Sequence, residues 1–440
     1  MSDNLLRRLV LERHWTYSAF VTQFERAAVL LSERDAEPRL GKLTISEKTF
    51  KRWTSGEIQS LPMPDVRRVL EFMFEQSVQA LFGPADAAIS LGSLTGMTSP
   101  NTLGSMIHMA AQRSLRYATL MQGSDITADG IGLLQEEAAR IALVFQREPL
   151  SEFIADLLDL QDLSFRALEG KYRPDQARDL HLLAAMACGM LAKASHDVAD
   201  THSAMSNARA AYLCAEQSGH DGLMAWVRAL MSLVTYWAGR HSQAIRYAQL
   251  GESITGAVGG ATVWLPSLEA RAHAAVGDAR STLDAIDRVH RARENLSTGD
   301  LDGLGNLFAF PLEKQNYYIA EALVQLGSST QEAAEAADVA VSGYLAASDD
   351  VFEWSSLAGA QASQAISRIA HGELDGAQEA LNPVLTLAPD LRINGIRVCV
   401  DRVYRHLPPG GASSPRIASD LRESIEDYSR TGPKAIPPVG

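Results

Sequence analysis

The chain has 440 residues, which is enough for two or three domains with substantial hydrophobic cores. Its apolar content of 46% and its charged content of 21% are ordinary for a soluble globular protein. The net charge of −13 argues against indiscriminate nucleic-acid binding by the chain as a whole.

No targeting or membrane signal is found in the sequence. There is no run of about 18 apolar residues, so no membrane span and no membrane partner are expected. The first residues lack an apolar signal core with a cleavage site, and we expect a cytoplasmic protein. Three widely separated cysteines, Cys188, Cys214 and Cys399, make no disulfide framework and are expected to be buried thiols.

The charge is unevenly distributed along the chain. Residues 1–83 carry 12 Lys and Arg against 11 Asp and Glu, whereas the remaining residues carry 28 against 42. Within residues 39–68 there are seven basic side chains and three acidic ones. A small basic module joined to a large acidic one is typical of many regulators. The alternative interpretation of this charge is a solvated face of mixed sign.

The first 83 residues predict a small helical domain. Apolar residues follow the 3.6-residue period from Leu5 to about Arg34, and Thr16 is a plausible internal cap, so we split this stretch into two helices near His14 and Trp15. Pro38 and Gly41 break the pattern. A short helix follows over 46–54, and a proline-initiated amphipathic segment runs from 64 to 82.

The segment 46–56 is the most informative stretch of this domain. Thr44 and Ser46 can cap the helix, and Phe50 and Trp53, three residues apart, can face a core. Lys48, Thr49, Lys51 and Arg52 then lie on or near the outer face, and Gly56 can end the helix. A helix that is apolar inside and basic outside suits the major groove of DNA. The alternative is a structural helix with a solvated basic face.

The rest of the chain divides by composition. Residues 84–105 are rich in Gly, Ser, Thr and Pro and are expected to be a linker. Residues 106–407 are rich in Ala and Leu with short breaks, and they predict successive helical hairpins without any sheet. Residues 408–440 are expected to be a flexible tail containing one short helix over 417–428.

The hairpins show a repeat built on small residues. Four glycines, Gly239, Gly277, Gly327 and Gly372, serve as anchors at steps of 38, 50 and 45 residues. Small or medium residues recur at fixed offsets around them, namely Ser232, Ala270, Ala320 and Ala365, then Ala244, Thr282, Ala333 and Ala377, then Gly251, Val289, Ala340 and Val384. Such residues let antiparallel helices approach closely and let the next pair stack on them. The 50-residue step requires an insertion near 297–305.

These offsets resemble the tetratricopeptide (TPR) repeat over about 180–392, with the best match at Ala365, Gly372, Ala377 and Pro389. The alternative is a generic Ala-rich helical bundle. The segment 46–56 likewise resembles the recognition region of lambda-repressor-like (XRE-type) helix-turn-helix proteins. Together the two resemblances imply an all-α fold, in which a helix-turn-helix module precedes an α-solenoid of TPR-like helical hairpins.

The helix-turn-helix resemblance implies a set of DNA contacts. Base edges would be read by Glu47, Lys48 and Arg52, with Thr49 and Lys51 nearer the phosphates. The sequence departs from the family in one respect. Thr16 and Ser46 lie 30 residues apart instead of about a dozen, which requires an insertion made of an extended helix to Arg34 and a loop over 35–42.

The whole chain is similar to actinobacterial transcriptional regulators that join such a helix-turn-helix to TPR-like repeats. The similarity implies a transcriptional regulator. Such a regulator is expected to bind double-stranded DNA, to form a homodimer, and to bind a peptide, protein or small ligand through the solenoid. Aromatic side chains on inner helices can line a concave groove for such an effector, and the candidates are Trp226, Tyr236, Trp264, Tyr317 and Trp354. The alternative role of these aromatics is packing in the core.

Two other functions remain open from the sequence. One is a protein-interaction scaffold with a vestigial helix-turn-helix that does not bind DNA. The other is an enzyme, for which no catalytic motif rises above background. No paired metal-ligand spacing and no phosphate loop is present in the sequence, so no cofactor and no metal are expected.

Overall fold

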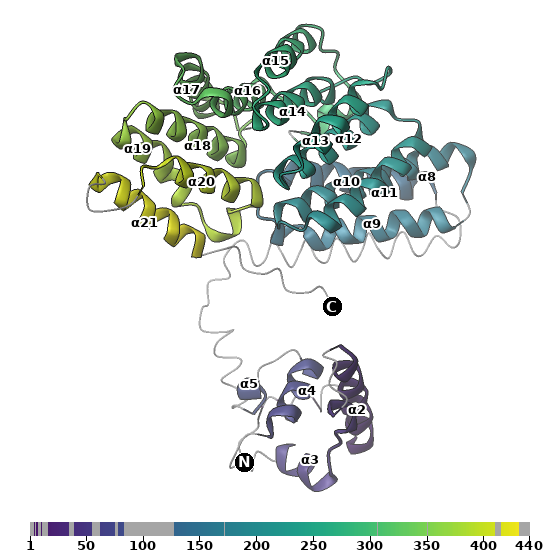
Figure 1. Ribbon diagram of the computed structural model, residues 1–440. Coiled ribbons are helices and arrows are strands. Elements are labelled where there is room, and N and C mark those ends of the chain that lie inside the picture. The colour runs from purple at the N-terminus through teal and green to yellow at the C-terminus, as the bar shows by residue number, and fades with distance from the viewer. Residues whose placement is uncertain are drawn as a thin grey trace. The chain divides into compact units, whose positions relative to one another are not determined.

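A computed structural model describes residues 4, 6–7, 10, 16–34, 39–54, 62–74, 78–82, 127–170, 172–305, 307–349, 351–409 and 415–430. The chain divides into two compact units, 1–110 and 111–440, and each is considered by itself. Every secondary-structure element described is a helix (Figure 1). None of these helices is long and apolar enough to cross a membrane. Gly56 and the predicted linker 84–105 lie outside the described residues.

The first unit contains four α-helices and one 3-10 turn among its described residues. They are α2 (Tyr17–Arg34), η1 (Leu40–Lys42), α3 (Glu47–Thr54), α4 (Pro64–Phe74) and α5 (Val78–Phe82). The first backbone bond of α2 runs from Phe20 N to Thr16 O at 2.9 Å, as expected from a helix start at Thr16. The helix then continues without a break to Arg34, so the extra residues lengthen α2 and add η1 before α3.

Aromatic rings hold these short helices together. The rings of Phe20 and Phe50 are 4.9 Å apart, which joins α2 to α3, and those of Trp53 and Phe82 are 5.7 Å apart, which joins α3 to α5. Phe50 and Trp53 are both buried, as predicted from their spacing. Aromatic pairs at such separations stabilise a core beyond the area that they bury.

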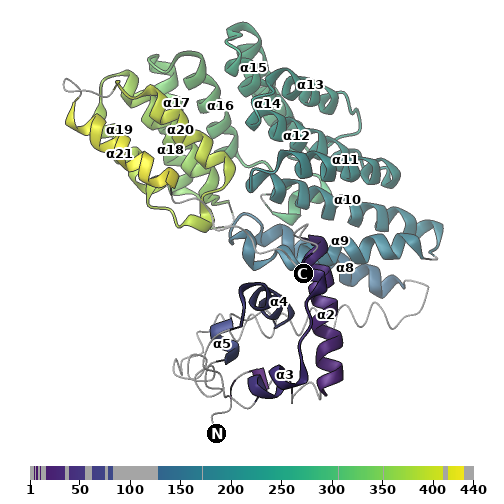
Figure 2. The ribbon, with the colours of Figure 1, turned by 60° about the horizontal axis from the view of Figure 1, so that its bottom comes forward.

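The second unit is a succession of antiparallel helix pairs (Figures 1 and 2). Its helices are α8 (Ala128–Val144), η2 (Leu150–Glu152), α9 (Ile154–Glu169), α10 (Pro174–Asp197), α11 (Thr201–Ser218), α12 (Asp221–Trp237), α13 (His241–Glu252), α14 (Ala261–Ala275), α15 (Ala279–Glu294), η3 (Asp300–Leu304), α16 (Leu312–Gly327), α17 (Gln331–Ala346), α18 (Trp354–Ala370), α19 (Leu374–Leu385), η4 (Pro389–Leu391), α20 (Asn394–His406) and α21 (Arg416–Arg430).

The even-numbered helices from α10 to α20 form a continuous inner layer, because each contacts the next one in the series. The odd-numbered helices pack behind them. The series also curves back on itself, since α20 contacts α10. Part of the predicted tail belongs to this structure, because α21 buries Leu421, Ile425 and Tyr428 in the same core.

The small residues singled out in the repeat lie at the helix interfaces, and all twelve are buried. At Gly251 in α13, a β-carbon would lie 2.4 Å from the Leu265 side chain of α14. The Ser232 hydroxyl of α12 donates to the Ala244 carbonyl of α13 at 2.8 Å. The close approach of successive helices therefore depends on residues that the repeat analysis identified.

Three of the four anchor glycines occupy the left-handed region at the turn of a hairpin. Their φ angles are 72° at Gly239, 76° at Gly277 and 79° at Gly372. Gly327 differs, because it is the last residue of α16 and does not take a positive φ. In the turn between α10 and α11 the left-handed position is held by Ala199, with φ 67°.

The insertion expected near 297–305 forms η3 and the chain that follows it. Asp302 fixes this segment, because its carboxylate accepts from Gly260 N and Gly299 N, both at 2.8 Å. The Leu307 carbonyl then accepts from the indole nitrogen of Trp226 at 2.9 Å. The insertion thus folds onto α12 and α14 instead of extending from the solenoid.

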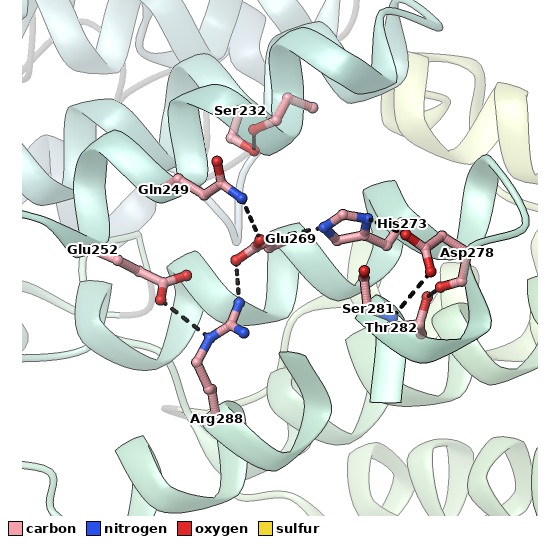
Figure 3. Close-up of polar contacts among 10 residues, drawn as sticks. Ser232, Gln249, Glu252, Glu269, His273, Asp278, Ser281, Thr282 and Arg288 are labelled. Atoms are coloured by element: carbon pink, nitrogen blue, oxygen red, sulfur yellow. Dashed lines mark hydrogen bonds and ion pairs between the residues drawn. The ribbon is translucent and has the colours of Figure 1, made fainter. Parts of the chain in front are cut away.

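A polar cluster connects α13, α14 and α15 (Figure 3). Glu269 of α14 is its centre and accepts from Gln249 of α13 at 2.8 Å and from Arg288 of α15. Arg288 also pairs with Glu252 of α13 at 3.3 Å, and His273 lies 3.3 Å from Glu269. Burial, followed by the charge of Glu269, raises the pKa of Glu252 to about 7.

Candidate nucleic-acid interface and central cavity

Helix α3 has two distinct faces. Phe50 and Trp53 are buried, whereas Glu47, Lys48, Lys51 and Arg52 are exposed and Thr49 is partly exposed. The five residues expected to contact DNA therefore lie on eight residues of helix whose apolar side chains turn inward. This pattern follows from apolar residues spaced three apart in an otherwise polar sequence.

The start of α3 is fixed by local hydrogen bonds. Ser46 is the cap, because its hydroxyl accepts from Thr49 N at 3.3 Å and lies 2.8 Å from the Thr49 hydroxyl. Thr44, the other expected cap, instead donates to Glu25 of α2 at 2.7 Å. The Tyr17 hydroxyl of α2 donates to the Ile45 carbonyl at 2.9 Å. These contacts hold the entry to α3 against α2 although the connection between the helices is long.

Two of the predicted contact residues interact with each other. Lys51 pairs with Glu47 one turn earlier at 2.8 Å, and both side chains are more than half exposed. An exposed pair of this kind contributes little to stability, so it does not compete strongly with a ligand for Lys51. Within this helix Lys48, Lys51 and Arg52 supply three cations against the one carboxylate of Glu47.

The inner layer of the second unit encloses a cavity with two adjoining chambers. The inner chamber has a volume of about 60 Å³ and the outer chamber one of about 480 Å³. They share the side chains of Gln146, Lys193, Asp197, Ser355 and Ile393. Every even-numbered helix from α10 to α20 contributes to the inner chamber, through Lys193, Trp226, Trp264, Tyr317, Ser356 and Ile396 respectively.

The five aromatics expected in an effector groove do not share one surface, although four of them line this cavity. Trp226, Trp264 and Tyr317 line the inner chamber, and Trp354 lines the outer one. Tyr236 lines a separate, more open hollow beside Arg402. Trp226 and Tyr236 are only 1% exposed, so both are core residues as well as wall residues.

Two buried ion pairs were not expected from the sequence. Lys193 and Asp197, one turn apart on α10, are 2.6 Å from each other, and Lys314 of α16 is 3.0 Å from Glu353, the residue before α18. Burial raises the pKa of Asp197, and Lys193 opposes that shift. Burial, helped by Lys193 and Arg271, lowers the pKa of His196 to about 3, so this imidazole is neutral at pH 7.

A second buried network adjoins the inner chamber, which Arg271 lines. Glu321 of α16 pairs with Arg271 of α14 at 2.6 Å and with Arg402 of α20, and its carboxylate accepts from the Tyr236 hydroxyl at 2.7 Å. Burial alone would raise the pKa of Glu321, but the two guanidinium groups hold it below its usual value. The network joins four of the inner helices, α12, α14, α16 and α20.

Two of these charged residues carry a signal in the sequence that could have located them. Lys193 and Glu321 each interrupt an apolar, alanine-containing stretch, where a solvated charge is not expected, whereas Lys314 lies in a polar run and gives no such signal. Asp197 lies one turn after Lys193, but the pairing of Arg271 with Glu321 could not be found in the same way, because the two residues lie 50 positions apart.

The three cysteines are free thiols. Cys188 and Cys399 are buried as expected, and burial raises their pKa values to about 11 and about 12. Cys214 is partly exposed. Across the described ranges, no three His, Cys, Asp or Glu side chains are grouped to hold a metal ion.

Comparison with known proteins assigns no family to the chain. No family model matches the sequence, and no curated protein matches it.

Proposed function

We propose that the chain is a DNA-binding transcriptional regulator whose second unit binds an effector. The observation that carries the proposal is the two-faced helix α3, which buries Phe50 and Trp53 and exposes Lys48, Lys51 and Arg52. Cations on a helix of this kind can contact both phosphates and guanine edges in a major groove.

The capped start of α3 supports this role. A recognition helix has to be held in a fixed orientation, because base readout depends on side chains reaching particular edges. The hydrogen bonds of Thr44 to Glu25 and of Tyr17 to the Ile45 carbonyl supply such an anchor in place of a tight turn. We propose that Glu47 accepts from a base edge, and that Thr49 and Lys51 contact the backbone.

The second unit is acidic, which favours a role in regulating DNA binding over a role in contacting DNA itself. Its curved inner layer encloses a cavity lined by six helices, which is where a ligand could change the relation between hairpins. We further propose that the regulator acts in the cytoplasm as a homodimer, so that two copies of α3 read two half-sites.

The test is the selection of genomic DNA fragments by the purified full chain at about 150 mM salt, where non-specific phosphate attraction is reduced. The variant carries Lys48→Ala, Lys51→Ala and Arg52→Ala. The control carries Arg166→Ala, Arg280→Ala and Arg416→Ala, which removes the same charge from exposed positions of the second unit. We expect a shared sequence motif from the wild type and the control, and none from the α3 variant.

Equal enrichment by all three proteins would show that α3 does not read DNA. Enrichment by none of them would favour the protein-interaction scaffold, and partners of the second unit should then be sought. The long connection between α2 and α3, which departs from the helix-turn-helix pattern, is the feature that favours this scaffold interpretation.

A further inference from the structure

The outer chamber of the central cavity spans the place where the solenoid closes on itself. One side is made by the turn after α8 and the end of α10, through Phe145, Phe153 and Val198. The other side is made by the start of α18 and the segment leading into α20, through Trp354 and Ile393. An occupant would therefore contact the first and the last helix pairs of the repeat at the same time.

The size and the walls of the chamber restrict what it can hold. Its volume of about 480 Å³ falls in the range of small-molecule sites, and it is small for a folded partner. The rings of Phe145 and Phe153 are 5.1 Å apart, and Trp354 adds a third aromatic wall. Flat aromatic walls favour a ring-containing apolar ligand, because rings pack at such separations with a gain beyond simple burial.

The charged side chains at the base of the chamber, Lys193, Asp197 and Arg392, already have partners, whereas Glu148, Asp390 and Arg397 line the chamber at exposed positions. Lys193 gives two hydrogen bonds to the Asp197 carboxylate, at 2.6 and 2.7 Å, and so balances it. Arg392 donates to the carbonyls of Leu387 and Tyr428 and lies 4.3 Å from the Tyr428 ring. A charged ligand would lose its hydration without gaining an uncommitted counter-charge at this depth, which is costly.

We propose that the outer chamber binds an uncharged aromatic small molecule, and that this molecule links the two ends of the solenoid. The inference deepens the effector role of the proposed function and rests on it for its regulatory meaning. Ligand binding itself is measured without DNA, so that failure of the ligand site and failure of DNA recognition are distinguishable.

The probes are three naphthalene derivatives of similar size at pH 7. They are 2-naphthol, which is neutral, 2-naphthoate, which is an anion, and 2-naphthylmethylammonium, which is a cation. Titration calorimetry with the full chain is expected to show 2-naphthol binding at least about tenfold tighter than either ion. Hydrogen–deuterium exchange is expected to slow both in the turn after α8 and in α20 when 2-naphthol is bound.

The variant is Val198→Trp, which fills the chamber from a residue that is 46% exposed and so leaves the core intact. Its control is Val276→Trp, because Val276 is also the C-terminal cap of an inner helix and is 53% exposed, but lines neither chamber. We expect Val198→Trp to weaken 2-naphthol binding at least about tenfold by steric exclusion, and Val276→Trp to leave it unchanged.

Three results would overturn the proposal. The first is no binding of 2-naphthol, and the second is tighter binding of either ion. The third is equal loss of binding in the two tryptophan variants. Unchanged circular dichroism and melting temperature of both variants would show that a loss of binding is not a loss of folding.

Discussion

Gly189 of α10 lies directly against the indole of Trp226 in α12, so that a β-carbon at position 189 would be 2.6 Å from Cζ3 of that ring. The ring cannot easily move away, because its nitrogen donates to the Leu307 carbonyl and its centroid lies 4.7 Å from that of the Phe308 ring. The absence of a side chain at this one position thus allows α10, α12 and the insertion to pack around a shared tryptophan.

Gly189→Ala is expected to lower the free energy of unfolding by about 1–3 kcal/mol through overpacking. Chemical denaturation followed by circular dichroism measures this change. The control is Gly132→Ala in α8, where a β-carbon would meet nothing within 4 Å. That substitution is expected to stabilise the helix by about 0.5–1 kcal/mol, because alanine loses less backbone freedom than glycine. Stabilisation by both changes would contradict the close contact with Trp226.

Ala199 occupies a left-handed turn position that glycine fills in three later hairpins. Since an L-residue is strained there, Ala199→Gly is expected to stabilise the protein by about 1 kcal/mol. The reciprocal change, Gly239→Ala, meets no atom within 4 Å and should destabilise it by about the same amount from backbone strain alone. Melting temperatures that shift in the same direction for both variants would disprove this assignment.

Glu321 balances two guanidinium groups, of which Arg271 is fully buried. Glu321→Gln leaves Arg271 and Arg402 without a counter-charge and is expected to cost about 3–5 kcal/mol of stability. The exposed Glu379 provides a control, since Glu379→Gln should change stability by less than about 0.5 kcal/mol. Urea denaturation of both variants and the wild type measures the free energy of unfolding. If Glu321→Gln lowered it by less than about 0.5 kcal/mol, the ion pairs of Glu321 with Arg271 and Arg402 would not stabilise the fold.

Glu252 gives a dependence of stability on pH. Its pKa is raised from 4.5 to about 7 in the folded protein, so the folded state binds this proton more tightly than the unfolded chain. Its contribution to stability is therefore present below about pH 4.5 and is lost as pH rises through about 7. Glu252→Gln removes this loss and should raise the melting temperature, relative to wild type, more at pH 8 than at pH 5.

Differential scanning calorimetry at these two pH values measures the effect. The control is Glu294→Gln at the end of α15, an exposed position whose variant should follow the wild type at both values. A difference between Glu252→Gln and wild type that is the same at pH 5 and pH 8 would show that Glu252 does not titrate in this interval.

The sequence predicted the local parts of this structure well, because they depend on residues close together in the chain. Helical periodicity placed the helices, and the three-residue spacing of Phe50 and Trp53 assigned the buried face of α3. Offsets between small residues located the helix interfaces, and glycine marked three of the hairpin turns. The exceptions are Gly327, which ends a helix without a positive φ, and Ala199, which takes a left-handed turn position although it is not a glycine.

The five aromatics expected in a groove do not line one surface. Four of them line the cavity, but Tyr236 binds Glu321 and borders another hollow. An aromatic side chain in a helical repeat is expected to be buried. Whether it lines a cavity depends on its neighbours in the folded structure.

The amino-acid sequence by itself thus determined which segments are helices, which of their faces are buried and where successive helices approach closely. The tertiary structure decided that α20 returns to α10, and that Lys193 with Asp197 and Lys314 with Glu353 line one cavity. The physical reason is that the closure of a solenoid is the sum of small rotations between successive repeats. No single repeat encodes that sum, so a site built across the closure becomes visible only when every hairpin is in place.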